Sequence, residues 1–218
     1  MARNLERDER EMELRRNKIL EAGLELFSTK GIEAVSLQAV ADKADVGVAT
    51  LYNYYENKVK LCVAISSWMW GQVWEETVRI NGADAFEVKT AIEIIELYID
   101  DILRVYRDRP DILRFSSEYK TFVCRDNKNM NEVKEHLEVL VPVDKLFHDA
   151  YEKAKTDKTI RTDIPEHELF TTVALTILGM AERYAQGIVW AMTEEKNYTN
   201  ELLHLKDMVL LWLKDGIK

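Results

Sequence analysis

The chain has 218 residues, 47% of them hydrophobic and 32% charged, which is typical of a folded globular protein. Its net charge of −9 argues against a protein that holds nucleic acid by overall positive charge. No apolar run approaches the roughly 20 residues of a transmembrane helix, and the charged N-terminus lacks the apolar core of a signal peptide. We therefore expect a cytoplasmic protein without a membrane span.

The negative charge is unevenly distributed. Residues 1–62 carry 10 Lys and Arg against 11 Asp and Glu, a net charge of −1, whereas residues 63–218 carry 20 against 28, a net charge of −8. The only cysteines, Cys62 and Cys124, both fall within apolar helical patterns. We expect them to be buried free thiols rather than a disulfide.

The first helix is expected over residues 11–29, with its apolar side chains recurring at helical spacing. The side chains expected to be buried are Ile19, Ala22, Leu26 and Phe27.

Residues 36–61 predict two short helices joined by a tight turn. Ser36 is a good N-cap, although Ala39 leaves the capping box incomplete. The sequence Asp45-Val46-Gly47 is suited to the turn, since Asp tolerates a left-handed backbone and Gly adopts one without strain. One face of the first short helix is expected to be buried, through Leu37, Val40, Ala41 and Ala44.

The second short helix begins at Val48 and directs Leu51 and Tyr55 inward. Its opposite face is thin and largely polar, as entry into a DNA major groove about 12 Å wide requires. That face carries Val48, Ala49, Thr50, Asn53 and Tyr54.

This segment resembles the DNA-binding domain of the tetracycline-repressor (TetR) family over roughly residues 15–62. Upstream, ILEAGLELFSTKGIEAVS is similar to the family's first helix, and LYNYYENKVKL matches its pattern at Leu51, Tyr52, Tyr54, Lys58 and Leu61. The departures are Asp45 for the usual turn Gly, Gly47 for a Ser or Thr cap, Ala49 for a frequent Gly and Tyr55 for Phe.

The resemblance implies a helix-turn-helix domain over residues 1–62 and a helical effector-binding and dimerisation domain over residues 63–218. It implies a repressor that a small apolar or aromatic molecule releases from a palindromic double-stranded DNA operator. We expect Thr50, Asn53 and Gln38 to reach base edges, and Ser36, Tyr52, Tyr54 and Lys58 to contact phosphates. Further phosphate contacts are expected from the basic residues around the helix pair, Arg15, Arg16, Lys18, Lys43 and Lys60.

The rest of the chain predicts helices only, about nine in all. The fourth helix, a long one, follows an N-cap at Asn57 and reaches the Asn81-Gly82 turn. Further helices are expected over residues 84–107, 111–124, 131–155, 165–192 and 198–214. Pro142 is expected to kink or break the helix over residues 131–155.

The middle helices are rich in aromatic and sulfur-containing side chains, which fill a core or line an apolar cavity with a few polar contacts. The resemblance implies such a ligand pocket, and its candidate residues are Trp68, Met69, Tyr98, Phe115, Tyr119, Phe122, Phe147 and Tyr151.

The last two helices are apolar over more of their circumference than one core contact needs. They are either central to the domain or form a four-helix bundle between two copies of the chain, as the resemblance implies. The candidate interface residues of this homodimer are Phe170, Ile177, Leu178, Ala181, Tyr184, Met208, Leu211 and Trp212.

Enzymatic motifs are missing from the sequence: it has no Gly-rich phosphate loop, no His-Glu-x-x-His and no Gly-x-Ser-x-Gly. The histidines show no metal-ligand spacing, so neither a metal nor a cofactor is expected. The alternative to a DNA-binding regulator is an all-helical small-molecule binding protein, or an enzyme, without a DNA role. The four histidines are His136, His148, His167 and His204.

Overall fold

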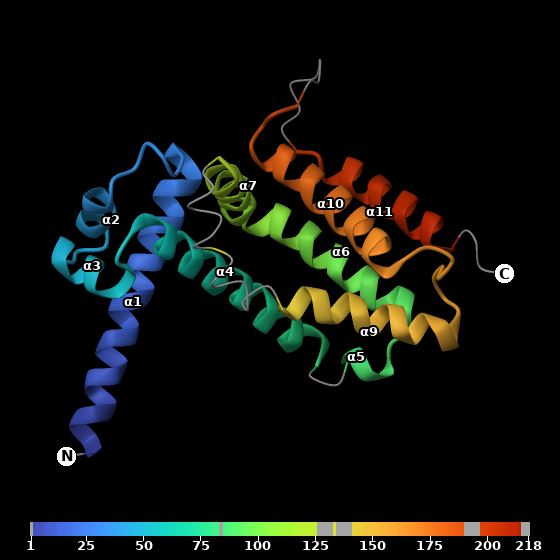
Figure 1. The fold of residues 1–218 in the computed structure, drawn as a ribbon, viewed down its shortest axis with the longest axis horizontal. Helices are drawn as coiled ribbons and strands as arrows, with labels where there is room; N and C mark the ends of the chain where they lie inside the picture. The colour runs from blue at the N-terminus through green and yellow to red at the C-terminus, as the bar shows by residue number, and fades with distance from the viewer. Residues whose placement is uncertain (1, 83–84, 126–132, 134–140, 190–196, 215–218) are drawn as a thin grey trace. The chain divides into compact units, whose positions relative to one another are not determined.

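The computed structural model describes residues 2–82, 85–125, 133, 141–189 and 197–214, and its elements in these ranges are all α-helices (Figure 1). The prediction of an all-α fold is confirmed. No helix in the described ranges combines the length and the apolar character needed to cross a membrane. The chain forms two compact units: unit 1 comprises Met1–Trp70 and Arg114–Leu137, and unit 2 comprises Gly71–Leu113 and Glu138–Lys218.

Unit 1 contains α1 (Ala2–Lys30), α2 (Leu37–Lys43), α3 (Val48–Tyr55), the first half of α4 (Lys58–Asn81) and the second half of α7 (Pro110–Cys124). The predicted α1 core is confirmed for Ile19, Ala22 and Phe27, whereas Leu26 is only half-buried. Helix α1 begins well before residue 11. The exposed side chains of Arg7 and Glu11, four residues apart on this helix, form an ion pair.

Two close contacts hold the core of unit 1 together. A methyl group built on Gly23 of α1 would lie 2.6 Å from the Ile65 Cδ1 atom of α4, so a larger residue at this position would require the Ile65 side chain to move. The ring of Phe115, from α7, lies 6.4 Å from that of Phe27 and 5.9 Å from that of Tyr119. Residues 114–124 thus pack with the N-terminal helices, although they are distant in sequence.

Unit 2 is built around α6 (Ala91–Asp108), which contacts α9 (Val141–Asp157), α10 (Glu166–Ala185) and α11 (Thr199–Lys214) (Figure 1). Three neighbouring helices explain why α6 is so strongly amphipathic. Its buried residues are Ala91, Ile94, Ile95, Ile99, Ile102, Val105 and Tyr106.

The prediction of one continuous helix over residues 84–107 is wrong. The chain forms a short α5 (Ala85–Val88) and starts α6 anew at Ala91, because Thr90 and Glu93 make a reciprocal capping box. The interruption is stabilised from α9, where Lys153 Nζ donates to the carbonyls of Phe86, Glu87 and Lys89 at 2.6–2.9 Å.

Pro142 lies in the first turn of α9, where a proline's missing N–H is tolerated. That it kinks or breaks the helix expected over residues 131–155 stays a prediction, because residues 134–140 lie outside the described ranges. Helix α10 ends at Ala185 instead of continuing towards Met192, because Gly187 adopts the left-handed conformation (φ 71°) that terminates helices. Residues 84, 131–132, 134–140 and 190–192 of the expected helices lie outside the described ranges.

Candidate nucleic-acid interface

Helix α2 starts as its sequence predicts. Ser36 has an extended backbone (φ −82°, ψ 154°), and its Oγ accepts the Ala39 amide proton at 3.1 Å. Ser36 is therefore a confirmed N-cap. The predicted buried face is also confirmed, through Leu37, Val40, Ala41 and Ala44.

The turn between α2 and α3 uses one left-handed residue. Asp45 has φ 56°, as predicted, while the Val46 amide donates to the Ala41 carbonyl at 3.0 Å. Gly47 is extended (φ −65°, ψ 140°) and precedes α3 as its N-cap, without a side-chain cap. The left-handed backbone is therefore needed at Asp45 and not at Gly47.

Helix α3 is held by Leu51, which is fully buried, and by Tyr55. The remaining positions face outward: Ala49, Tyr52 and Asn53 are exposed. Val48, Thr50 and Tyr54 are half-buried on the same helix. The structure thus gathers the six predicted α3 residues on one accessible helix, anchored by two buried side chains.

Several of the predicted DNA contacts are engaged within the protein, among them Lys58 and Gln38. Lys58 Nζ donates to the carbonyl oxygens of Ile32 at 2.9 Å and Glu33 at 3.4 Å. The Gln38 side-chain amide donates to Asp42 at 2.7 Å. Both side chains must exchange these partners to reach DNA.

A surface groove beside α3 is lined by Met12, Glu13, Arg16, Tyr54 and Tyr55. Burial raises the pKa of the Tyr55 hydroxyl, and the neighbouring Arg16 partly opposes this increase. Sequence reasoning assigned no role to Met12 or Glu13. Spacing along α1 alone does not reveal which helix these residues face.

The predicted ligand-binding residues fall into two separate groups. Trp68, Met69, Phe115, Tyr119 and Phe122 belong to unit 1, where Phe115 and Met69 are buried in the core. Burial raises the pKa of Tyr119 to about 12. In this unit the aromatic side chains pack against each other and the helices around them.

The second group lies in unit 2 and consists of Tyr98, Phe147 and Tyr151. Phe147 makes edge-to-face contacts with Tyr98 at 5.1 Å and with Phe170 at 4.7 Å between ring centroids. The Tyr151 hydroxyl donates to the Ile164 carbonyl at 2.7 Å. Burial, reinforced by the charge of Glu182, raises the pKa of Tyr98.

The predicted dimer residues also divide. Ile177 and Ala181 are completely buried within the single chain, so they belong to the core of unit 2 and offer no surface to a second copy. Phe170 packs on Phe147, and Tyr184 stacks on Tyr198 at 4.6 Å. Four of the five candidate interface residues on α10 are therefore engaged within the single chain.

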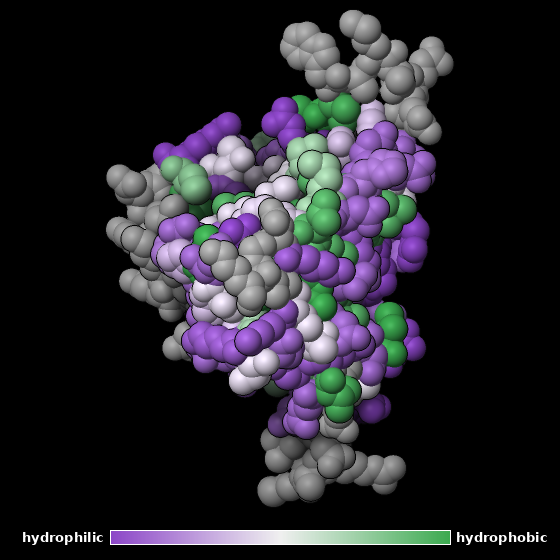
Figure 2. All heavy atoms as spheres, turned by 90° about the vertical axis from the view of Figure 1, so that its right-hand side faces the viewer, coloured by the Kyte–Doolittle hydropathy of each residue, from purple (hydrophilic) through white to green (hydrophobic). Residues whose placement is uncertain are grey.

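Other apolar side chains of α10 and α11 do reach the surface. Met208 is 66% and Leu211 71% exposed, and Leu175, which the sequence analysis did not select, is 64% exposed. Leu178 and Trp212 are half-buried, and the Trp212 ring lies 4.9 Å from the Arg161 guanidinium. Figure 2 shows apolar side chains in green among hydrophilic ones in purple on one face of the molecule.

Two short helices joined by a tight turn, with the second helix accessible along its polar face, define a helix-turn-helix DNA-binding protein. Residues 19–65 match the family model described as bacterial regulatory proteins, tetR family. These residues therefore form a DNA-binding domain of the tetR type. The chain is a DNA-binding transcriptional regulator, which confirms the prediction of a regulator rather than an enzyme.

Known proteins agree with this assignment. The chain is 29% identical over 202 residues to the HTH-type transcriptional repressor KstR of Rhodococcus jostii, covering 93% of this chain and 84% of that protein. It is 52% identical over 50 residues to KstR of Mycolicibacterium smegmatis, covering 23% and 24% of the two chains. The transcriptional regulator FadR from Bacillus subtilis, solved in complex with stearoyl-CoA, has a TM-score of 0.69 and 17% identity, covering 92% of this chain and 98% of that one.

Proposed function

We propose that this protein is a cytoplasmic repressor that binds a palindromic operator as a homodimer and releases it when a small apolar or aromatic molecule binds. The observation that carries the proposal is the accessible face of α3, which Leu51 and Tyr55 fix to unit 1. The similarity to two repressors named KstR supports the sign of regulation.

The proposed readout divides the α2–α3 surface by chemistry. Thr50, Asn53 and Gln38 contact base edges, where an amide side chain can pair with adenine. Val48 and Ala49 supply small apolar surface of the kind that meets thymine methyl groups. The phosphate contacts come from Ser36, Tyr52, Tyr54 and Lys58.

We place the effector site in unit 2, around the contact of Phe147 with Tyr98 and Phe170. These rings lie on three different helices, α9, α6 and α10, so a ligand that binds among them would change how the three helices pack. FadR of Bacillus subtilis, which has the same fold, is described in complex with stearoyl-CoA, and this supports an apolar effector.

Helix α4 is the proposed connection between effector and operator. It runs unbroken from Lys58 to Asn81, with Leu61 and Ile65 buried in unit 1 and Thr77 buried in unit 2. An effector that favours a different position of this helix by about 1.4 kcal/mol lowers operator affinity tenfold.

The test of the proposed function is a selection of bound sequences from random DNA duplexes. We expect an enriched palindrome whose half-sites lie one helical turn, about 34–36 Å, apart. Replacing Asn53 by Ala should change the preferred sequence, while Tyr52→Phe should weaken binding to all sequences alike. Selection that enriches no palindrome would overturn the proposal.

Effector binding has a separate readout in Trp74, which stacks on Phe86 at 5.2 Å within unit 2. Apolar ligands of graded chain length should change the tryptophan fluorescence and lower operator affinity over the same concentration range. Ligands that change the fluorescence without any effect on DNA binding would contradict the proposed coupling.

A further inference from the structure

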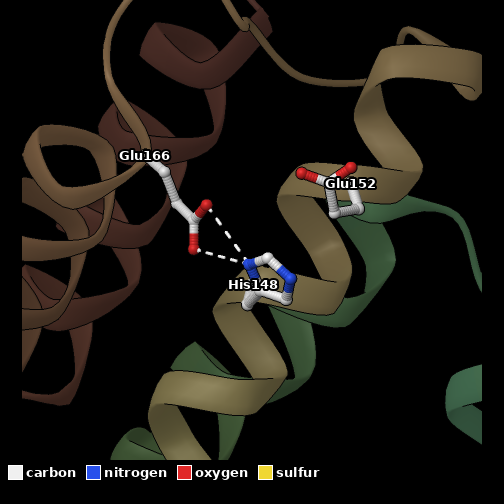
Figure 3. A group of neighbouring side chains, drawn as sticks. All are labelled: His148, Glu152 and Glu166. Atoms are coloured by element: carbon white, nitrogen blue, oxygen red, sulfur yellow. Dashed lines mark hydrogen bonds and ion pairs between the residues drawn. The ribbon is translucent and has the colours of Figure 1, made fainter.

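A histidine and two glutamates from two helices converge in unit 2. His148 and Glu152 are four residues apart on α9, and Glu166 is the first residue of α10 (Figure 3). The His148 Nδ1 atom lies 3.0 and 3.3 Å from the two carboxylate oxygens of Glu166. One ligand atom from each of the three side chains lies within 4.8 Å of the others.

This donor set suits a particular class of cation. One imidazole nitrogen and two carboxylate oxygens are ligands of Zn²⁺, Co²⁺, Ni²⁺ and Mn²⁺, whereas Mg²⁺ and Ca²⁺ prefer oxygen donors alone. In a tetrahedral zinc site with bonds of about 2.0–2.2 Å, ligand atoms are about 3.3–3.5 Å apart. The His148 Nδ1 atom already lies 3.3 Å from one Glu166 oxygen, and Glu152 would reach this spacing by turning its exposed side chain.

We propose that His148, Glu152 and Glu166 bind a divalent transition-metal ion, with water completing the coordination. The ion takes the place of the proton that His148 Nδ1 shares with Glu166, and this proton passes to solvent. It also replaces Lys155, which donates to Glu152 in the metal-free protein. Because His148 and Glu152 are exposed, the site binds its ion reversibly and exchanges it with solvent.

The ion would join α9 to the start of α10 across the connecting residues 158–165. The Tyr151 hydroxyl of α9 already donates to the Ile164 carbonyl of this connection, whereas the Arg161 amide joins the connection to α11 by donating to the Leu213 carbonyl at 2.7 Å. The metal would add a direct tie between α9 and the N-terminal end of α10. The site consists of residues of unit 2 alone, so its existence does not depend on the proposed DNA or effector binding.

The chain contains a matched control for this site. His167 and Glu168 are also an exposed histidine and glutamate at the start of α10, but their closest N–O distance is 4.0 Å and no third ligand atom is grouped with them. Metal binding by any surface His–Glu pair would affect both places equally, whereas the proposed site requires His148 and Glu166.

The experiment is calorimetric titration of the tag-free, chelator-treated protein with Zn²⁺, Ni²⁺ and Mg²⁺, in a Cys124→Ser background because that thiol is exposed. We expect one equivalent of Zn²⁺ or Ni²⁺ and no Mg²⁺. His148→Ala, Glu152→Gln and Glu166→Gln should each weaken metal binding by more than about tenfold. Removing a residue that only hydrogen-bonds to a metal ligand already weakens binding by about 10–100-fold, so removing a ligand itself should cost at least as much.

His167→Ala and Glu168→Gln should bind the metal like the parent protein. Circular dichroism of each variant verifies that it is folded. The proposal is overturned if the parent protein shows no saturable binding, or if His148→Ala and His167→Ala bind equally well.

Discussion

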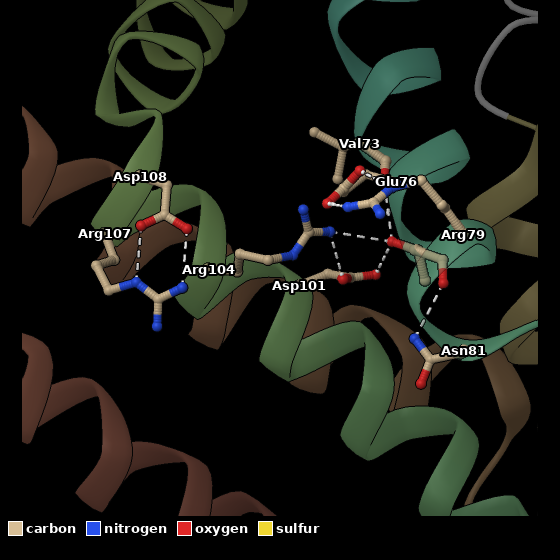
Figure 4. A network of polar contacts seen from close by, with 9 residues as sticks. Val73, Glu76, Arg79, Asn81, Asp101, Arg104, Arg107 and Asp108 are labelled. Atoms are coloured by element: carbon tan, nitrogen blue, oxygen red, sulfur yellow. Dashed lines mark hydrogen bonds and ion pairs between the residues drawn. The ribbon is translucent and has the colours of Figure 1, made fainter.

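Thr77 of α4 and Asp101 of α6 are joined by a short hydrogen bond of 2.5 Å between the threonine hydroxyl and a carboxylate oxygen. Arg104 donates to the same hydroxyl oxygen at 3.2 Å and to Asp101 at 2.7 Å (Figure 4). Thr77 is only 1% exposed, and the side chains of Asp101 and Arg104 are mostly buried. This polar cluster fixes the second half of α4 to the central helix of unit 2.

Replacing Thr77 by Val should therefore destabilise the protein. The isosteric side chain removes a hydrogen-bond donor from a partly buried carboxylate, which should lower the free energy of unfolding by about 1–3 kcal/mol. The matched control is Thr29→Val. The Thr29 hydroxyl is also a hydrogen-bond donor, to the Glu25 carbonyl, but this side chain is exposed. Urea denaturation measures both variants, and equal effects would show that burial of the Thr77 cluster contributes nothing.

The contact between Gly23 and Ile65 gives a second prediction. Gly23→Ala places a methyl group 2.6 Å from Ile65 Cδ1 and should lower the unfolding free energy by about 1–3 kcal/mol. Ile65→Val deletes that atom and leaves Ile65 Cγ1 at 3.6 Å from the new methyl group, which is an ordinary contact. The double variant should therefore lose less unfolding free energy than the sum of the losses in the two single variants.

Gly71 is the control for this cycle, since nothing lies within 4 Å of a methyl group built there. Gly71→Ala should raise the unfolding free energy by about 0.5–1 kcal/mol, because alanine favours the helix. Denaturation of the four proteins measures the coupling. Strict additivity of Gly23→Ala and Ile65→Val would contradict the proposed clash.

The two thiols should differ in reactivity. Cys62 is buried as predicted, but the prediction of a buried Cys124 is wrong, because the last residue of α7 is exposed. In the native protein a disulfide reagent should therefore modify one thiol per chain rapidly, and both only after unfolding. Cys124→Ser should abolish the rapid phase, and a rapid phase that persists in this variant would contradict the burial of Cys62.

Burial also raises the pKa of the Cys62 thiol, so folding should become less favourable in alkali. Below the ordinary thiol pKa of about 8.5 the thiol is protonated in both states, and its contribution to stability does not depend on pH. Above that value the unfolded chain loses the proton while the native chain keeps it, so the unfolding free energy falls as the pH rises. The unfolding free energy of Cys62→Ala should decrease less between about pH 8 and pH 10, a range that includes the ordinary thiol pKa.

The exposed apolar surface of α11 gives a test of the homodimer. Leu211→Asp places a charge on a side chain that is 71% exposed in the single chain, so folding should be retained. In the proposed dimer the charge would be buried without a partner, and the dimer should dissociate and lose operator binding. Val88→Asp on α5 is the control, since Val88 is 83% exposed.

Sedimentation at micromolar concentration distinguishes these cases. We expect a monomer for Leu211→Asp and a dimer for both the parent protein and Val88→Asp. A parent protein that sediments as a monomer, or a Leu211→Asp variant that remains a dimer with full operator binding, would remove α11 from the interface.

Lys58 should affect both stability and DNA binding. Lys58→Met removes the charged hydrogen bonds to Ile32 and Glu33 and should lower the unfolding free energy by about 1–2 kcal/mol. If Lys58 also contacts a phosphate, the Lys58→Met variant binds all DNA sequences more weakly. The slope of log affinity against log salt concentration then becomes shallower by about 1. The exposed Lys30 provides the control, Lys30→Met, and an unchanged salt dependence for Lys58→Met would exclude the phosphate contact.

The amino-acid sequence by itself determined the elements whose causes are local. The N-cap at Ser36, the left-handed turn residue Asp45 and the buried pair Leu51 and Tyr55 all follow from neighbours within about four residues. Such interactions can be read along the chain before the fold is known. They were sufficient to predict the helix-turn-helix and the all-α class.

The tertiary structure decided how side chains from distant helices are used. Lys58 is held by carbonyls 25 and 26 residues away, and Thr77 by Asp101, 24 residues away. His148 meets Glu166 across the connection between two helices, and Ile177 lies in the core instead of at the surface. Periodicity shows that a helix face is apolar, but the packing of the other helices decides whether that face meets the core, a ligand or a second chain.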